Sequence, residues 1–204
     1  VHGEPWKILI IDDEADVHKV TAYMIKGLDY LGRSCTFLHA YSGQEAKAIL
    51  NQHQDIAVIL LDVVMESEDS GLQLVHYIRE ELRNRTVRIV LLTGQPGYSP
   101  QREIIMNYEI DDYRLKSDLS ADKLFTCVYA ELRTYQALRM LEKKRLVEQL
   151  ADELRGANAQ LKVEIAEHQR AQAIADAVRG QAGTVTEEAK PSSQASALLY
   201  DLTT

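Results

Sequence analysis

The sequence predicts an α/β protein, a doubly wound parallel sheet of the (βα)5 type followed by a long C-terminal helix. Two observations predict the sheet. Short, almost continuously apolar runs recur along residues 1–130, and the segments between them repeat apolar side chains every three or four positions. Such runs are typical of strands buried on both faces, and such spacing is typical of amphipathic helices. A third observation predicts the long helix, because residues 121–178 contain no proline and keep the helical spacing.

Five strands and five helices are expected to alternate in the first part of the chain. Ser42 and Glu45 form a capping box at the start of one helix. Apolar faces mark two others, with Val17, Val20, Met24 and Leu28 on the first and Leu72, Val75, Ile78 and Leu82 on the second. We expect strands at residues 6–11, 35–41, 56–61, 87–92 and 110–115, and helices at 15–28, 43–53, 71–82, 100–108 and from about 120. This order fits a flavodoxin-like sheet.

Polar residues stand at the carboxyl ends of four expected strands: Asp12 and Asp13, then Asp62, Thr93 and Lys116. Ligands of open α/β sheets bind beyond these ends, so we expect the five side chains to converge in one crevice. Three carboxylates in one pocket repel one another unless a cation balances them, and Mg²⁺ prefers such oxygen ligands. Asp62 is then suited to accept a phosphoryl group, whose oxygens Lys116 and Thr93 would bind.

Each of these residues also has a purely structural interpretation when it is considered alone. Asp12, Asp13 and Asp62 are suited to capping a helix or a strand end, Thr93 to a turn, and Lys116 to a solvated surface. The occurrence of all five in this order favours the functional interpretation.

Four motifs surround the polar residues at the expected strand ends. They are Ile10-Ile11-Asp12-Asp13-Glu14, Leu60-Leu61-Asp62-Val63-Val64-Met65, Leu91-Leu92-Thr93-Gly94 and Asp112-Tyr113-Arg114-Leu115-Lys116. In this order and spacing they resemble the receiver domain of bacterial two-component response regulators, and the resemblance covers residues 5–130. Pro5-Trp6-Lys7 and residues 93–97 further resemble a subfamily of receivers attached to cyclic-dinucleotide signalling proteins.

The resemblance implies that a partner histidine kinase or phosphotransfer protein phosphorylates Asp62. It also implies that Mg²⁺ binds Asp13, Asp62 and the backbone carbonyl of Val64, while Asp12 acts largely through water. The family's catalytic set would thus be complete in this chain.

The resemblance further implies a conformational switch near the phosphoryl group. Thr93 would move toward the phosphoryl group, and Tyr113 would turn inward with it. A half-buried strand tyrosine is an equally good interpretation of Tyr113. We expect His39 to be an ordinary strand residue and Asp111-Asp112 to lie in a solvated turn.

Three departures from the family pattern concern loops. Glu66 stands where the family has a proline, and Ser117 replaces the proline that follows the lysine through a cis bond. A cis bond before serine costs roughly 2.5–4 kcal/mol, so we expect a trans bond and a reshaped loop. The link over residues 24–33 is also longer than usual. None of these departures removes a catalytic group.

The second part of the chain is predicted to be a coiled-coil signalling helix over residues 131–179. A helix over residues 121–178 would be about 90 Å long, more than one domain can cover, so a parallel homodimer is the economical arrangement. Residues 180–204 are expected to be a flexible linker or the start of a further output domain. The heptad positions, which alternate steps of three and four, are Val147, Leu150, Leu154, Ala157, Leu161, Glu164, His168, Ala171, Ala175 and Val178.

Composition and charge narrow the class of protein. The 204 residues are 46% hydrophobic and 26% charged, which excludes a mainly disordered chain. The formal net charge is −8, of which residues 1–130 carry −7, and this argues against direct nucleic-acid binding. No apolar run reaches the roughly 18 residues of a membrane span. Two cysteines and no leader-like start favour the cytoplasm.

We therefore expect a phosphoacceptor receiver that passes its signal through a dimeric helix to an output domain. The chain shown would not be an enzyme, apart from self-phosphotransfer and autodephosphorylation. Two alternatives remain at this point: a dimerisation scaffold that is never phosphorylated, and an N-terminal regulatory fragment of a cyclic-dinucleotide enzyme.

Overall fold

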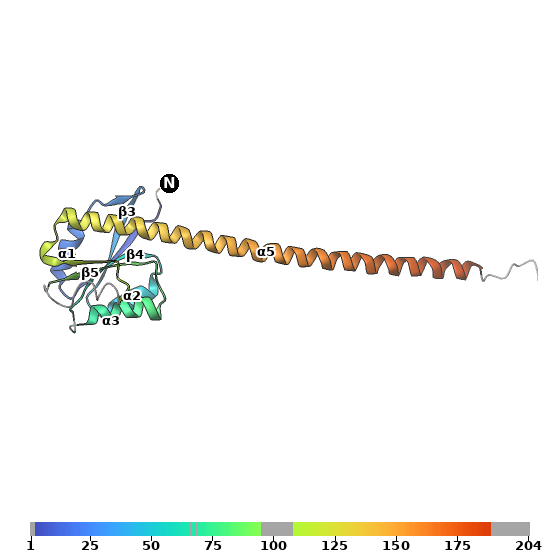
Figure 1. Ribbon diagram of the computed structural model, residues 1–204, viewed down its shortest axis with the longest axis horizontal. Helices are drawn as coiled ribbons and strands as arrows, with labels where there is room; N and C mark the ends of the chain where they lie inside the picture. The colour runs from blue at the N-terminus through green and yellow to red at the C-terminus, as the bar shows by residue number, and fades with distance from the viewer. Residues whose placement is uncertain (1–2, 66, 68, 95–107, 189–204) are drawn as a thin grey trace, which may run out of the picture. The chain divides into compact units, whose positions relative to one another are not determined.

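The computed structural model describes residues 3–65, 67, 69–94 and 108–188, with the side chains of the last helix described to residue 179 (Figure 1). The chain divides into two compact units, Val1–Lys144 and Arg145–Thr204. The first unit contains a sheet and its helices, and the described part of the second is the continuation of helix α5, Ala121–Glu188. The predicted long C-terminal helix is confirmed.

The sheet has six strands in the order β2-β3-β1-β4-β5-β6. Strands β3, β1, β4, β5 and β6 are parallel, and only the short β2 pairs antiparallel, with β3. The parallel doubly wound sheet predicted from the apolar runs is therefore confirmed. The strands are β1 Trp6–Ile11, β2 Asp29–Tyr30, β3 Arg33–Ala40, β4 Ile56–Asp62, β5 Arg88–Thr93 and β6 Asp112–Leu115.

Helices cover both faces of the sheet (Figure 1). Side chains alternate along β1, so that Ile8 and Ile10 join the core under α1 and α5, and Leu9 and Ile11 join the core under α2 and α3. The expected helix at residues 100–108 falls mostly on residues outside the described ones. The covering helices are α1 Ala15–Met24, α2 Gly43–Gln52, α3 Ser70–His76 with its π-helical continuation η1 Tyr77–Glu81, and the first part of α5.

A hairpin between α1 and β3 explains the long link noted in the sequence. Its two-residue turn, Leu31–Gly32, has φ values of 57° and 70°, which is typical of the type I′ turns that join antiparallel strands. Trp6 Nε1 donates a 3.0 Å hydrogen bond to the carbonyl of Tyr30. The additional strand thereby ties the start of β1 to the edge of the sheet.

The packing face of α1 differs from the one expected. The helix ends at Met24, and Val20, expected in the core, is 51% exposed. His18 and Thr21 are buried instead. A buried imidazole is tolerated here because both of its nitrogens have hydrogen-bond partners, whereas apolar spacing alone gives no sign of such partners.

The expectation that Asp111 lies in a solvated turn was wrong. Its side chain is only 10% exposed and pairs with Arg79 at 3.1 Å and with Arg88 at 2.5 Å. It also accepts a 2.6 Å hydrogen bond from the backbone N–H of Ile89. Burial raises the pKa of Asp111, although the Ile89 hydrogen bond and the two guanidinium groups act in the opposite direction. The ion pairs join η1 to the start of β5, at the end of the sheet away from Asp62.

Candidate functional site

Two buried aspartates and one lysine meet at the carboxyl ends of the central strands. Asp12 directly follows β1 and Asp62 ends β4, and their residues are 1% and 6% exposed. Lys116 begins the 3-10 turn η2, Lys116–Asp118, directly after β6. Its Nζ donates to Asp12 Oδ2 at 2.7 Å and to Asp62 Oδ2 at 2.8 Å. Parallel pairing of β1, β4, β5 and β6 brings these distant residues together.

A third carboxylate completes an all-oxygen cluster. Asp13 is exposed, and one oxygen each from Asp12, Asp13 and Asp62 lies within 4.8 Å of the others. Asp12 Oδ1 also accepts a 3.0 Å hydrogen bond from the backbone N–H of Glu14, which fixes the carboxylate. Three converging carboxylates, of which Lys116 contacts only Asp12 and Asp62, fit a hard divalent cation such as Mg²⁺.

Burial shapes the electrostatics of this cluster. It raises the pKa of Asp62, and the neighbouring Asp12 raises it further, against the opposing effect of Lys116. Burial acts to lower the pKa of Lys116, but its hydrogen bonds to Asp12 and Asp62 outweigh that effect, so the net shift is upward. Lys116 therefore remains a firmly held cation, and ionisation of Asp62 carries a cost that a bound divalent cation would relieve.

The backbone around Asp62 is shaped by a glycine. Gly71 N–H donates to the carbonyl of Val63 at 3.1 Å, which brings the start of α3 against the end of β4. A Cβ on Gly71 would lie 2.8 Å from Val63 Cα and closer still to the carbonyl oxygen of Asp62. From the sequence, Gly71 was predicted only to begin a helix. The close approach of two backbone segments leaves no signal in the spacing of apolar residues.

The predicted switch residues lie on the two neighbouring strands. Thr93 ends β5 and is 1% exposed, and Tyr113 lies in β6, paired with Leu91, and is 8% exposed. Tyr113 belongs to the core under α2 and α3. The peptide bond between Lys116 and Ser117 is trans, as expected for a serine in place of proline.

Two histidines beside the cluster were not anticipated as part of the site. His18 Nε2 lies 2.8 Å from the carbonyl oxygen of Asp12, and His18 Nδ1 lies 2.9 Å from His39 Nδ1. If His18 donates to the carbonyl from Nε2, its Nδ1 accepts and His39 donates. Burial, followed by the neighbouring His18, lowers the pKa of His39. The pair fixes the backbone at Asp12, a role that the separation of the two histidines in sequence concealed.

An apolar groove of about 250 Å³ adjoins the charged cluster between α1 and α5. Lys116 is one of its lining residues, and the same side chain contacts the buried Asp12 and Asp62. Its apolar walls are formed by Val17, Val20, Met24, Leu92, Leu119 and Leu124.

Replacing Asp62 with asparagine is expected to stabilise the protein at pH 7 when no divalent cation is present. The pKa of Asp62 is raised, so the native state binds its proton more tightly than the unfolded state does, and ionisation costs stability. From about pH 4 upward we expect the free energy of unfolding of Asp62→Asn to exceed that of the wild type, with the difference growing until Asp62 is ionised in the native state and reaching roughly 0.5–2 kcal/mol at pH 7.

Urea unfolding in a chelating buffer measures this difference at several pH values. Below the ordinary pKa of aspartate, about 3.9, both proteins are neutral at this position and the difference should disappear. An Asp62→Asn protein that is less stable than the wild type at pH 7 would contradict the expectation.

Comparison with known proteins finds matches to the part of the chain that contains the sheet and the charged cluster. Residues 8–128 match the family model of the response regulator receiver domain. A curated protein of Vibrio cholerae serotype O1, 3′3′-cGAMP-specific phosphodiesterase 2, is 45% identical over 143 residues. These residues are 70% of this chain but 27% of that protein, so the chain spans about a quarter of its relative.

Solved structures share the fold. The signal receiver domain of an HD domain-containing protein from Pseudomonas fluorescens Pf-5 has a TM-score of 0.56 at 18% identity, covering 69% of this chain and 96% of that one. NtrX from Brucella abortus has a TM-score of 0.56 at 21% identity, with 69% and 29% covered. A CheY-like receiver domain from Methanospirillum hungatei JF-1 has a TM-score of 0.52 at 18% identity, with 65% and 98% covered. Among the described residues, no helix is both long and apolar enough to cross a membrane.

Proposed function

This chain belongs to the response regulator receiver domain family, and from that premise we propose that Asp62 accepts a phosphoryl group from a histidine kinase or phosphotransfer protein. The observation that carries the proposal is the pair of 2.7 and 2.8 Å contacts from Lys116 Nζ to Asp12 and Asp62. A carboxylate that is 6% exposed, beside a lysine and two other acids, is better suited to accepting a phosphoryl group than to capping a strand.

In the proposed reaction a carboxylate oxygen of Asp62 attacks phosphorus, and the bond from phosphorus to the donor's leaving group breaks. Lys116 neutralises charge on a phosphoryl oxygen, and the Thr93 hydroxyl donates a hydrogen bond to another. Asp13, Asp62 and the Val64 carbonyl would hold Mg²⁺, with Asp12 acting through water. When bound, the ion offsets negative charge on the carboxylates and on the incoming phosphoryl group.

The donor protein is proposed to dock at the apolar groove between α1 and α5. Two observations support this position. Lys116 lines both the groove and the charged cluster, and Val20 in the groove wall is 51% exposed on a helix whose polar His18 is buried instead. Together these features offer an apolar contact surface beside the acceptor carboxylate.

The proposed output runs through the C-terminal helix. Thr93 and Tyr113 act as the switch, and residues 131–179 transmit the change as a helix dimer, after a receiver over residues 1–130. The linker or start of an output domain expected over residues 180–204 begins later than expected, because α5 continues to Glu188. By itself the receiver carries out only phosphotransfer to itself and autodephosphorylation.

A second candidate is favoured by the 45% identity to a cGAMP phosphodiesterase. On this proposal the receiver regulates an enzyme that acts on a cyclic dinucleotide, and the two candidates are compatible. A scaffold that is never phosphorylated is a third possibility, which the complete set of Asp12, Asp13, Asp62, Thr93 and Lys116 argues against.

Intact mass after incubation with acetyl phosphate and Mg²⁺ tests the main proposal. We expect one phosphoryl adduct on the 204-residue chain, none on Asp62→Asn, and none when Mg²⁺ is chelated. If the wild type forms no adduct, titration with beryllofluoride and Mg²⁺ is decisive. If beryllofluoride binds, the site is intact and phosphorylation requires a cognate donor protein. If it does not bind, the result favours the scaffold.

A further inference from the structure

The peptide bond between Asp12 and Asp13 joins two of the three clustered carboxylates. The atoms of a peptide unit lie close to one plane, so the orientation of this plane sets the directions in which both side chains leave the main chain. The Asp12 carboxylate is held further by the Glu14 N–H and by Lys116 Nζ. The Asp13 side chain is exposed and has no hydrogen bond or ion pair among the described residues. Its direction therefore depends on the peptide plane.

Hydrogen bonds hold the main chain of Asp12 from both sides. Its N–H donates to the carbonyl of Ala40, at the end of β3, at 3.2 Å. His18 Nε2, in α1, lies 2.8 Å from its carbonyl oxygen. That oxygen belongs to the peptide unit shared with Asp13, so His18 is the side chain that acts on the plane common to both acids.

His18 occupies a core position that the apolar spacing of α1 would give to an aliphatic residue. It is 2% exposed, whereas Val20 on the same helix is 51% exposed. An imidazole brings polar nitrogens into the core, and their burial is costly unless they are hydrogen-bonded. Departures of this kind from local sequence rules are expected where a residue serves a functional site.

The contact with the Asp12 carbonyl requires one tautomer of each histidine when the pair is neutral. A carbonyl oxygen can only accept, so His18 carries its proton on Nε2 and has a lone pair on Nδ1. His18 Nδ1 lies 2.9 Å from His39 Nδ1, so His39 carries its proton there. The ring of Tyr41 lies 4.3 Å from that of His18, centroid to centroid, and His39 is exposed. His18 is thus enclosed, and His39 connects it to solvent.

We propose that His18 is a positioning residue for the divalent cation site, and that His39 holds it in the tautomer this role requires. By fixing the Asp12–Asp13 peptide plane, His18 sets the directions of two carboxylates before the ion arrives, which reduces the ordering that binding must impose. Neither imidazole contacts the ion in this role. The inference rests on the Mg²⁺ site in the proposed function.

Mg²⁺ titration of the full chain, followed by the backbone amide NMR signals of Asp13 and Asp62, tests the role of His18. His18→Leu should raise the dissociation constant by about 10–100-fold, the usual effect of losing a residue that orients a metal ligand. His18→Gln can still donate from its amide and should recover part of this loss. His53→Leu is the matched control, because it removes an imidazole near the start of β1, 3.4 Å from Lys7 Nζ, and should leave the affinity unchanged.

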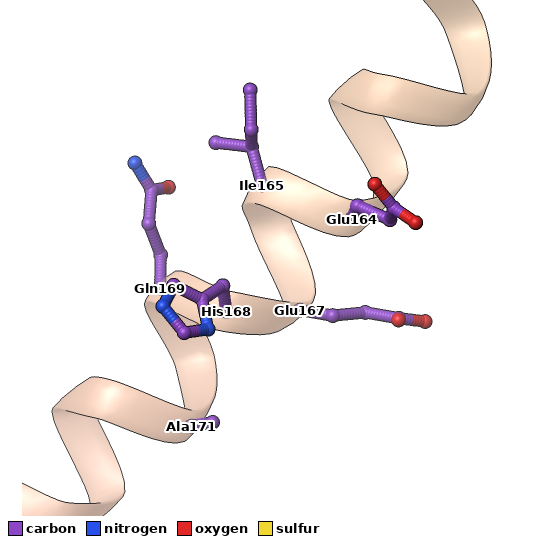
Figure 2. A pocket seen from close by; sticks show the side chains of 6 residues that line it. All are labelled: Glu164, Ile165, Glu167, His168, Gln169 and Ala171. Carbon is purple, nitrogen blue, oxygen red and sulfur yellow. The ribbon is translucent and has the colours of Figure 1, made fainter.

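Nitrogen-15 NMR of the imidazole rings tests the same geometry in a chelating buffer, with no ion bound. We expect the proton of His18 on Nε2 and that of His39 on Nδ1. His168, which projects from α5 in Figure 2 and is exposed, is an internal reference because water exchanges its two tautomers. A neutral His39 protonated on Nε2 instead would overturn its role in holding His18.

The remaining outcomes separate this inference from the proposed function. An unchanged Mg²⁺ affinity in His18→Leu, or an equal loss in His53→Leu, would overturn the positioning role. If His18→Leu does not fold, His18→Gln and the tautomers of the wild type still decide. Mg²⁺ binding by the wild type without a phosphoryl adduct would defeat the proposed phosphorylation and leave the positioning role intact. An adduct on the wild type, together with unchanged affinity in His18→Leu, would do the reverse.

Discussion

Replacing Gly71 with alanine is expected to destabilise the protein by about 3 kcal/mol, the upper end of the usual cost of overpacking. The added methyl group would lie 2.8 Å from Val63 Cα, 2.9 Å from the Val63 carbonyl oxygen and closer still to the Asp62 carbonyl. All three neighbours are backbone atoms of a central strand and its exit loop, so they cannot rotate away as a flexible side chain would. Urea unfolding measures the loss directly.

The same substitution should also disturb the acceptor site. Relief of the clash requires α3 to move away from β4 or the backbone at Asp62 to shift, and a shift of Asp62 would disturb its 2.8 Å contact with Lys116 Nζ. We therefore expect slower formation of the phosphoryl adduct in whatever fraction of Gly71→Ala remains folded. Adduct formation at the wild-type rate, with wild-type stability, would contradict the expected clash.

Gly156→Ala is the matched control for the effect of adding a methyl group to glycine. Gly156 lies inside α5, and a Cβ there would meet nothing within 4 Å. Alanine favours a helix by about 1 kcal/mol over glycine, so this variant should leave the receiver unchanged and strengthen the helix. Circular dichroism of the full chain during thermal unfolding would report the gain.

The strands and the charged cluster are the features that the sequence predicted best, and both depend on short-range patterns. Continuous apolar runs such as residues 56–61 have few alternatives to a buried strand. Residues at the ends of parallel strands must share one edge of the sheet, which is why Asp12, Asp62 and Lys116 could be brought together without knowing any distance.

Features that the sequence missed depend on contacts between distant residues. Asp111 was assigned to solvent because its partners Arg79 and Arg88 lie 32 and 23 positions away in a chain whose pairing was not yet known. His18 replaced Val20 in the core because the Asp12 carbonyl and His39 provide hydrogen bonds that no periodicity records. The hairpin at residues 29–33 required a leucine at positive φ, a conformation that sequence preferences argue against.

Replacing Lys116 with methionine should slow phosphorylation of Asp62 by about 10²–10³-fold, the usual effect of removing one preorganised charge-stabilising group. Methionine keeps much of the aliphatic length and removes the charge. Asp12, Asp13 and Asp62 remain, so the acidic cluster should still take Mg²⁺, and the loss should appear in the rate of adduct formation rather than in Mg²⁺ binding. Time-resolved intact mass with acetyl phosphate measures that rate.

Stability provides an independent readout of the same substitution. Without the lysine, Asp62 loses the cation that opposes burial and the neighbouring Asp12, so the pKa of Asp62 rises further. The native state then holds its protons more tightly, and stability falls as pH increases from about 4 to 7 more steeply than in the wild type. Added Mg²⁺ should recover part of the loss, because it supplies positive charge to the same oxygens.

Lys123→Met separates these effects from the simple loss of a positive charge. Lys123 is exposed on α5 and its Nζ contacts only the carbonyl of Asp118 among the described residues, at 3.1 Å. The Lys123→Met substitution changes the net charge by the same amount as Lys116→Met, but it leaves the contacts of Lys116 with Asp12 and Asp62 in place. If both variants slow phosphorylation equally, Lys116 acts only through the overall field of the protein, and the 2.7 and 2.8 Å contacts have no special role in the reaction. A slow Lys116→Met beside an unaffected Lys123→Met would instead locate the effect in those two contacts.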